Sequence, residues 1–354
     1  MSVNGPESRE VKAGGTARRP EIPGAVRHVF SRVDTESLSL IIALAILVIA
    51  IASQTDKFFL PRNLLNIGQN VSVLGLVAVG ETIVILAGAL DISVGSIAGV
   101  ASVTAAIALQ HTSLAGGGVA AGLMVGLAFG VANGLVVTVL RVNPVIATLA
   151  TFAAFRGIAF LLAPGGKPVG VSNEGFINIG VGRIFDTDTF PGIPVSLLLL
   201  IGVAAAVEVM LRYTDFGRSI YAMGGNPAAA RLAGISLNRM RIAIYGSSGA
   251  LAGLAGIVVT ARVTAGEPAS GTQGLELQAI TAVLLGGAAL TGGKGSVIAT
   301  MLAVLLVGTL TDGMNLLGIQ TFYQDVAQGL LLITAVAIGQ YRAARAERAR
   351  TRTG

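Results

Sequence analysis

Long apolar runs separated by short polar connections fill the chain from about residue 38 to residue 340. A helix needs roughly 20 apolar residues to cross the hydrocarbon core of a bilayer, which is about 30 Å thick. By that measure the pattern predicts an all-α polytopic membrane protein of about ten transmembrane helices, or about eight if the short glycine-rich runs do not cross. The predicted spans are residues 38–54, 71–88, 92–110, 115–140, 145–163, 194–212, 241–262, 277–291, 296–312 and 321–340.

The composition agrees with burial in lipid and argues against several kinds of chemistry. Hydrophobic residues make up 53% of the chain and charged residues 12%, about half of the charged share of a soluble protein. The 48 glycines favour helices that pack closely in a membrane. Because the chain has no cysteine and only two histidines, we expect no disulfide, no metal site and no histidine-dependent catalysis.

The formal net charge of +6 points either to nucleic-acid binding or to the charge asymmetry of a membrane protein. Aromatic residues for base stacking are scarce, at 5% with no tryptophan, so we expect no nucleic-acid partner. Placing the N terminus in the cytoplasm puts most of the 24 Lys and Arg residues on the cytoplasmic side, as the positive-inside rule requires. The charges therefore predict that both termini are cytoplasmic.

The polar segments divide the chain into three parts. Residues 1–37 have no apolar face and no signal-peptide pattern, which predicts a disordered basic cytoplasmic tail. The transmembrane domain follows at 38–340, and 341–354 form a second basic cytoplasmic tail. Two loops within the domain are long: an external loop at 164–193, which we expect to be partly ordered, and a cytoplasmic loop at 212–240.

The cytoplasmic loop at 212–240 carries the signals of a short helix. Asn226 is a favoured N-cap residue, Pro227 stands at the favoured first helical position, and Gly234 fits the position after the helix end. These signals predict a helix of about seven residues, roughly 10 Å long, which is too short to cross a membrane. We expect a second short element from Gly217 onward, joined to the first by a glycine turn.

The surface of this short helix allows two interpretations of the loop. It is mostly alanine, with Arg231 and Leu232, and would fit a shallow groove on another protein. The alternative interpretation is an ordinary connection between two membrane helices.

Four stretches of the chain resemble the permeases of bacterial ABC importers of the ribose/xylose/galactose family. They occur in the order and spacing of that family, and the resemblance covers roughly residues 65–340. One departure is Ala89, which stands where the family often has a second glycine after Gly88. The stretches are 86–98 (LAGALDISVGSIA), 133–157 (with NG, RVNPVIATLAT and FRG), 217–235 (GRSIYAMGGNPAAARLAGI) and 282–296 (AVLLGGAALTGGKGS).

The resemblance implies a permease subunit in the cytoplasmic (inner) membrane of a bacterium. Such subunits form dimers, receive a monosaccharide from an extracytoplasmic sugar-binding protein, and dock through a coupling helix on a cytoplasmic ABC ATPase that binds ATP and Mg²⁺. ATP binding would then move the spans between inward-open and outward-open states by rigid-body rocking. For this chain the resemblance assigns ATPase coupling to Gly217, Arg218, Tyr221, Gly224, Gly225, Asn226, Pro227, Ala229, Ala230, Arg231, Leu232 and Gly234.

Ionisable residues inside spans are costly and are therefore candidates for function. Glu81 and Arg156 fall near the middle of the membrane and carry opposite charges, so they either form a structural ion pair or line a polar path for sugar hydroxyls. Asp91 or Ser93 could cap the next helix, or the turn could act as a gate or an ATPase contact. The candidates for a gate or the translocation path are Glu81, Asp91, Ser93, Gly95, Ser96, Asn133, Asn143, Pro144, Thr148, Thr151 and Arg156.

Four further acidic residues lie near the predicted span ends. We expect Glu208 to extend from the inner end of its span toward solvent, and the other three to be solvated. The other three are Glu276, Asp312 and Asp325.

Two enzyme interpretations fail on missing residues. A phosphate loop at 287–296 would require lysine where Gly293 stands, so we expect no nucleotide or other cofactor bound by this chain. The stretch 246–249 (GSSG) matches a rhomboid protease motif, but no histidine follows Ser248 to act as a base. The chain is therefore expected to be a transporter subunit without its own ATPase site.

Two transporter alternatives stay open. An ion-coupled secondary transporter could use Glu81, Asp91 and Asp325 as carriers, but it gives the loop at 212–240 no role. A faint similarity between the turns at 88–96 and 287–296 is the only sign of repeated halves. An ABC permease for branched-chain amino acids or another non-sugar solute fits the same sequence, because a permease alone does not identify its solute.

Overall fold

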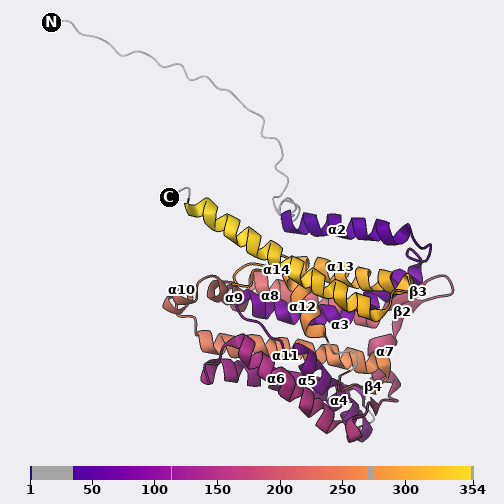
Figure 1. Cartoon of the computed structure of the whole chain (residues 1–354). Helices are drawn as coiled ribbons and strands as arrows, with labels where there is room; N and C mark the ends of the chain where they lie inside the picture. Colours follow the sequence, from indigo (N-terminus) through magenta and orange to yellow (C-terminus); the bar gives the residue numbers. More distant parts are fainter. Residues whose placement is uncertain (2–34, 113, 270–273, 352–354) are drawn as a thin grey trace.

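The computed structural model describes Met1 and residues 35–112, 114–269 and 274–351, so the tail expected at 1–37 lies almost wholly outside the described residues. The described chain is a bundle of long helices with short strands at one end (Figure 1). The helices are α2 (Thr35–Ala52), α3 (Pro61–Leu86), α4 (Val94–His111), α5 (Ala115–Val139), α6 (Pro144–Leu162), α7 (Glu174–Val181), α8 (Val195–Tyr213), α9 (Asp215–Gly225), α10 (Pro227–Leu232), α11 (Leu237–Val263), α12 (Leu275–Leu285), α13 (Val297–Leu316) and α14 (Thr321–Thr351).

Within the described residues, seven helices are long and apolar enough to cross a membrane, which confirms a helical polytopic membrane protein. The seven are α3, α4, α5, α6, α8, α11 and α13. Two shorter apolar helices lie beside them, in α2 and at α12. Each predicted span coincides with a helix, but α12 ends at Leu285, where Gly286 and Gly287 follow, instead of continuing to residue 291.

The start of the second predicted span was wrong by ten residues, because α3 begins at Pro61 and not at residue 71. The first turns of α3 carry polar side chains that lowered the apolar signal. These side chains have distant partners: the amide of Asn63 donates to Asp312 (3.1 Å), Asn66 accepts from Arg183 (3.1 Å), and Gln69 donates to the carbonyl of Gly180 (2.7 Å). Tertiary contacts therefore make this polar stretch helical.

The centre of the bundle is α3, in which every residue from Val71 to Leu86 is buried. Helices α5 and α11 lie side by side near it (Figure 1) and approach each other along a stripe of glycines. A Cβ atom added to Gly249 would lie 2.7 Å from the Cα atom of Gly130, and one added to Gly253 would lie 2.8 Å from the carbonyl oxygen of Gly122. Small residues at four-residue spacing thus allow close backbone packing, as in other membrane bundles.

The expected external loop is ordered as short elements at one end of the bundle. A 3₁₀ turn (Pro164–Gly166) leads to β1 (Val169–Gly170), which pairs antiparallel with β4 (Ala265–Gly266). After α7, β2 (Arg183–Asp186) pairs antiparallel with β3 (Pro191–Pro194), with Ile184 opposite Ile193. These pairs close the end of the bundle that lies opposite α9 and α10.

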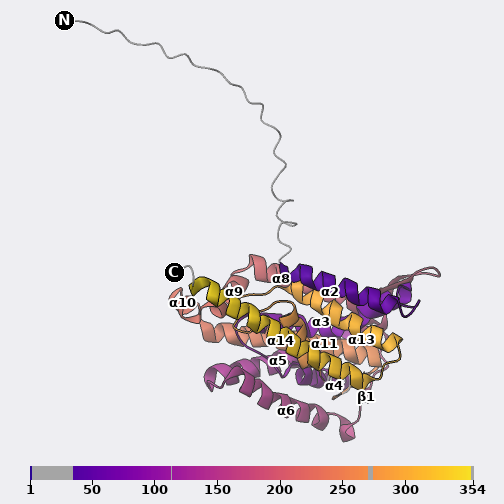
Figure 2. The same ribbon diagram turned by 45° about the horizontal axis from the view of Figure 1, so that its top comes forward.

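The two short helices α9 and α10 lie together at the other end of the bundle, which we call the coupling end (Figures 1 and 2). The last residues of α14 lie at this end as well. The helix α14 continues to Thr351, so most of the segment expected as a tail at 341–354 prolongs the last predicted span as a helix.

Candidate functional site

The short helix α10 forms as its local signals predict. The Asn226 side chain accepts a hydrogen bond from the amide of Ala229 (3.0 Å), and Pro227 is the first helical residue. The helix has six residues and ends before Gly234, whose φ of +87° favours glycine. The amide of Ile235 then donates to the carbonyl of Ala230 (3.0 Å), which closes the C-terminal cap.

The preceding element, α9, is a helix of 11 residues and is amphipathic by burial. Thr214 caps it by accepting from the amide of Gly217 (3.2 Å), and Arg218 pairs with Asp215 on the exposed side. The expected glycine turn is wrong in its position, because residues 224–225 form the last turn of α9 and the chain changes direction at the extended Asn226.

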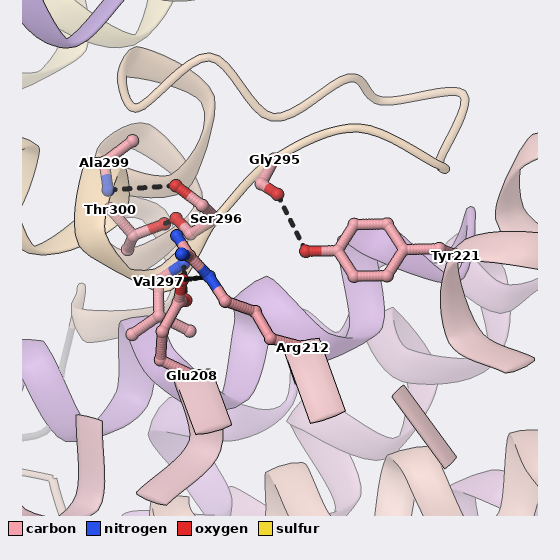
Figure 3. A network of polar contacts seen from close by, with 8 residues as sticks. All are labelled: Glu208, Arg212, Tyr221, Gly295, Ser296, Val297, Ala299 and Thr300. Carbon is pink, nitrogen blue, oxygen red and sulfur yellow. Dashed lines mark hydrogen bonds and ion pairs between the residues drawn. The ribbon is translucent and has the colours of Figure 1, made fainter. Parts of the chain in front are cut away.

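A polar network joins α8 and α9 to the start of α13 (Figure 3). The Tyr221 hydroxyl donates to the carbonyl of Gly295 (3.0 Å), while Glu208 pairs with Arg212 and accepts from the amide of Val297 (3.0 Å). Glu208 therefore does not extend freely toward solvent as expected, because its carboxylate binds the first turn of α13. Ser296 completes this end of α13 by accepting from the amide of Ala299 (3.2 Å).

The end of α9 also packs against two turns of similar geometry, one after α3 and one after α12. A Cβ atom on Gly224 would overlap the carbonyl of Leu86, which already accepts from the amide of Gly293 (2.8 Å). In both turns a glycine with positive φ follows the helix, Gly88 at +78° and Gly287 at +86°. The similarity expected between the two turns is therefore present in the backbone, and the two turns touch each other.

The residues predicted for ATPase coupling divide into two sets by exposure. One set is buried or half-buried and attaches the segment to the bundle: Gly217, Tyr221, Gly224 and Ala230. The other set is exposed, and in it Leu232, the last residue of α10, is 90% exposed. The exposed set is Arg218, Gly225, Asn226, Pro227, Ala229, Arg231, Leu232 and Gly234.

A second group of predicted residues meets in the interior near the coupling end. Glu81, Asp91, Ser93 and Asn133, from α3, the α3–α4 turn and α5, are fully buried. Glu81 accepts from the amide of Asp91 (3.1 Å), Asp91 accepts from the amide and hydroxyl of Ser93 (2.9 and 2.6 Å), and Asn133 donates to the Ser93 hydroxyl (2.6 Å). We call these four residues the inner polar cluster.

Two expectations about the inner polar cluster were wrong. Glu81 forms no ion pair with Arg156, which instead lies over the ring of Phe152, 5.9 Å from its centroid. Ser93 stands at the N-cap position of α4, but its hydroxyl binds Asp91 instead of a backbone amide of the helix. Asp91 likewise binds Ser93, and not the first turn of α4.

Burial sets the electrostatics of the α3–α4 turn. Desolvation raises the pKa of Asp91 from 3.8 to about 6, although the hydrogen bonds from Ser93 and Asn133 oppose the rise. Gly95 and Ser96 follow in the buried first turn of α4, where the Ser96 hydroxyl donates to the carbonyl of Ser93 (2.8 Å). The turn is thus held from both sides by buried hydrogen bonds.

The remaining predicted path residues lie along α6 and do not join the inner polar cluster. Asn143 caps α6 by accepting from the amide of Val145 (3.0 Å), and Pro144 is its first residue. The hydroxyls of Thr148 and Thr151 bind carbonyls of their own helix. The side chains of Asn143, Thr148 and Thr151 thus all bind backbone groups of α6 or its first turn, as capping and helix-internal residues do.

A polar cavity that the sequence pattern did not predict lies near the end of the bundle opposite the coupling end. The cavity has a volume of about 460 Å³ and lies among α3, α11, α12 and α13. An adjacent groove of about 520 Å³ separates α12 from α14, and Gln278 lines both. The polar residues that line the cavity are Asn70, Arg262, Gln278, Thr311, Asp312 and Asn315.

Several side chains of this cavity are fixed by neighbours. Asn70 binds Arg262, Asn63 donates to Asp312 (3.1 Å), and Gln324 donates to Asn315 (2.7 Å). Asp312 is only 8% exposed, so the expectation that it is solvated was wrong. Glu276, at 6% exposure, is also buried, whereas Asp325 is exposed. The spacing of polar residues in the first turns of α3 is the signal that could have revealed this cavity.

Residues 63–336 match the family model described as branched-chain amino acid transport system / permease component. The chain is 38% identical over 321 residues to the ribose import permease protein RbsC of Escherichia coli (strain K12), covering 88% of this chain and 96% of that protein. It is 36% identical over 307 residues to the L-arabinose transport system permease protein AraH of the same organism, covering 87% and 91%. No solved structure matches the chain.

Proposed function

Because the chain belongs to the family of branched-chain amino acid transport system permease components, we propose that it is the membrane-spanning subunit of an ATP-driven ABC importer for a monosaccharide. The relatives named for ribose and L-arabinose favour a sugar over an amino acid, and each match spans most of both chains. The permease would lie in the bacterial cytoplasmic membrane, in keeping with its seven membrane-length helices.

The observation that carries the proposal is the outward-facing α10. Its Leu232 and Arg231 are exposed at the coupling end, while Ala230 is buried. An exposed leucine on a short helix fits a groove on a cytoplasmic ATPase. The ATP and Mg²⁺ would bind to that ATPase, and a second permease chain and an extracytoplasmic sugar-binding protein would complete the importer.

We place the coupling end in the cytoplasm and propose ten crossings. The helices α9 and α10 and the end of α14 share the coupling end. With α2, α12 and α14 counted as crossings, both termini lie on the cytoplasmic side, where the basic residues gather.

Motion would pass from the ATPase to the spans through the buried contacts of α9. Closure of the ATPase domains would displace α10 and α9 together. The Tyr221–Gly295 hydrogen bond and the contact of Gly224 with Leu86 would transmit this displacement to α13 and α3. Rigid-body rocking of this kind is a common form of conformational change.

The polar cavity would then be the first position that the sugar occupies after it leaves the binding protein. Sugar hydroxyls both donate and accept hydrogen bonds, and the cavity offers Arg262 as a donor and Asp312 as an acceptor. The backbone amide of Gln278 donates to the carbonyl of Gly274 (3.1 Å), but its side-chain amide makes no hydrogen bond to the described residues. That side-chain amide would bind a hydroxyl group and guide the sugar toward the adjacent groove.

Uptake measurements test the proposal. Deletion of the chain from its organism should abolish ATP-dependent uptake of one pentose or hexose, and the intact gene should restore it. Loss of leucine, isoleucine or valine uptake in the deletion strain, with sugar uptake unchanged, would establish the amino-acid alternative. Uptake that survives ATP depletion but fails when the proton or sodium gradient is dissipated would establish a secondary transporter and refute the proposal.

A further inference from the structure

The inner polar cluster contains more hydrogen-bond acceptors than donors. The second carboxylate oxygens of Glu81 and Asp91 and the amide oxygen of Asn133 are buried and have no hydrogen-bond partner. All three are acceptors. The residues that carry the two carboxylates lie next to each other in the fold, since the backbone amide of Asp91 donates to the Glu81 carboxylate (3.1 Å). The cluster therefore lacks positive charge or donors at its centre.

No cation of the described chain supplies this charge. The two ion pairs among the described residues, Arg212–Glu208 and Arg218–Asp215, involve neither Glu81 nor Asp91. The other ionisable groups close by are Tyr245, whose hydroxyl donates to the carbonyl of Leu90 (3.2 Å), and Arg241 beside Tyr245. A buried carboxylate without a counter-charge is strongly destabilised and becomes neutral instead.

The two carboxylates differ in how they are stabilised. Asp91 accepts two close hydrogen bonds from Ser93 and a longer one from Asn133 (3.5 Å), and such donors favour an ionised carboxylate. Glu81 accepts only one bond, from a backbone amide. Glu81 is thus the group that needs the proton and Asp91 the group that holds the charge.

We propose that Glu81 carries a proton in the folded protein, and that this neutral carboxyl holds the α3–α4 turn in place beside Asp91. The proton changes the second Glu81 oxygen from an unpaired acceptor into a donor within a cluster that has unpaired acceptors. Glu81 is then a positioning residue and carries no ion across the membrane.

The position of this turn matters for coupling, an inference that rests on the proposed function. The turn begins directly after Leu86, whose carbonyl binds Gly293 and touches Gly224 of α9. A displaced α3–α4 turn would therefore disturb the same contacts that would connect α9 to α3 and α13.

Substitution by glutamine tests the proposal, because glutamine has the shape of a protonated glutamate and its side-chain NH₂ group donates a hydrogen bond as the carboxyl O–H does. Glu81→Gln should keep the melting temperature and the transport rate near those of the wild type, whereas Glu81→Ala should lower both. Glu208→Gln is the matched control, because Glu208 is ion-paired with Arg212 and binds the Val297 amide. We expect Glu208→Gln to lower the melting temperature, since it removes the negative charge that pairs with Arg212.

Infrared spectroscopy of the purified chain gives a readout that does not depend on transport. At neutral pH the wild type should show the carbonyl stretch of a buried protonated carboxyl, which shifts in D₂O and loses intensity in Glu81→Gln but not in Glu208→Gln. Absence of that band in the wild type would overturn the proposal. A melting temperature that depends on Na⁺ or K⁺ and loses this dependence in Glu81→Gln would overturn it as well, by assigning a metal ion to the cluster. A chain that shows the band but transports no sugar would refute only the proposed function.

Discussion

Gly224 is the position at which a single methyl group should do the most damage to the coupling end. An added Cβ atom would overlap the carbonyl oxygen of Leu86 and lie 2.6 Å from the amide nitrogen of Gly293. Those two groups form a hydrogen bond of 2.8 Å, so the methyl group would separate them. Overpacking costs about 1–3 kcal/mol and a lost hydrogen bond about 1 kcal/mol, so we expect Gly224→Ala to destabilise the protein by about 2–4 kcal/mol.

The neighbouring Gly225 provides a matched control for Gly224→Ala. No atom lies within 4 Å of a Cβ atom built on Gly225, and both glycines belong to the last turn of α9. Gly225→Ala should therefore leave the melting temperature unchanged or raise it slightly, because alanine favours a helix over glycine by up to about 1 kcal/mol. The assay is thermal unfolding of both variants in the same detergent, followed by sugar uptake for Gly224→Ala. Equal melting temperatures for the two variants would refute the packing described at this contact.

Three further substitutions test other contacts. Tyr221→Phe removes one hydrogen bond to Gly295 and should cost about 1 kcal/mol of stability while raising the ATP consumed per sugar, and an unchanged ratio would contradict the transmission route. The pKa of Asp91 is raised in the folded state, so the free energy of unfolding is highest below about pH 4, where Asp91 is protonated, and falls by about 3 kcal/mol as the pH rises toward 6. Asp91→Asn should remove this dependence from the free energy of unfolding measured between pH 4 and 8. An identical pH profile for the variant would be inconsistent with burial of Asp91. Gln278→Leu should raise the sugar concentration for half-maximal uptake without changing thermal stability, and unchanged uptake would exclude a role for the cavity.

The short helix α10 was predictable from sequence because its signals are local. Asn226 binds an amide only three residues away, Pro227 needs no partner for its missing amide hydrogen, and Gly234 adopts the positive φ that its type allows. The apolar runs were equally informative, since lipid imposes a minimum length on each span. Both kinds of signal depend on neighbours within one or two helical turns.

The interior contacts were not predictable, because they join residues far apart in the sequence. Glu81 and Arg156 were paired by charge and depth alone, yet the fold places Glu81 beside the amide of Asp91. The polar start of α3 looked like a loop because its partner Asp312 lies 249 residues further along the chain from Asn63. Depth in a membrane is visible in a sequence, whereas rotation about the helix axis and contacts between helices are set by tertiary packing.

Recovery of the chain from its own membranes tests the central claim most directly. The tagged wild type, solubilised in a mild detergent, should bring down an ABC ATPase that mass spectrometry identifies by its nucleotide-binding motifs. Leu232→Asp places a charge on the exposed side chain of α10 and should abolish this recovery while the melting temperature stays at the wild-type value. Equal recovery of the ATPase with both proteins, or no ATPase with the wild type even after crosslinking at α10, would contradict the assignment of α9 and α10 as the coupling segment.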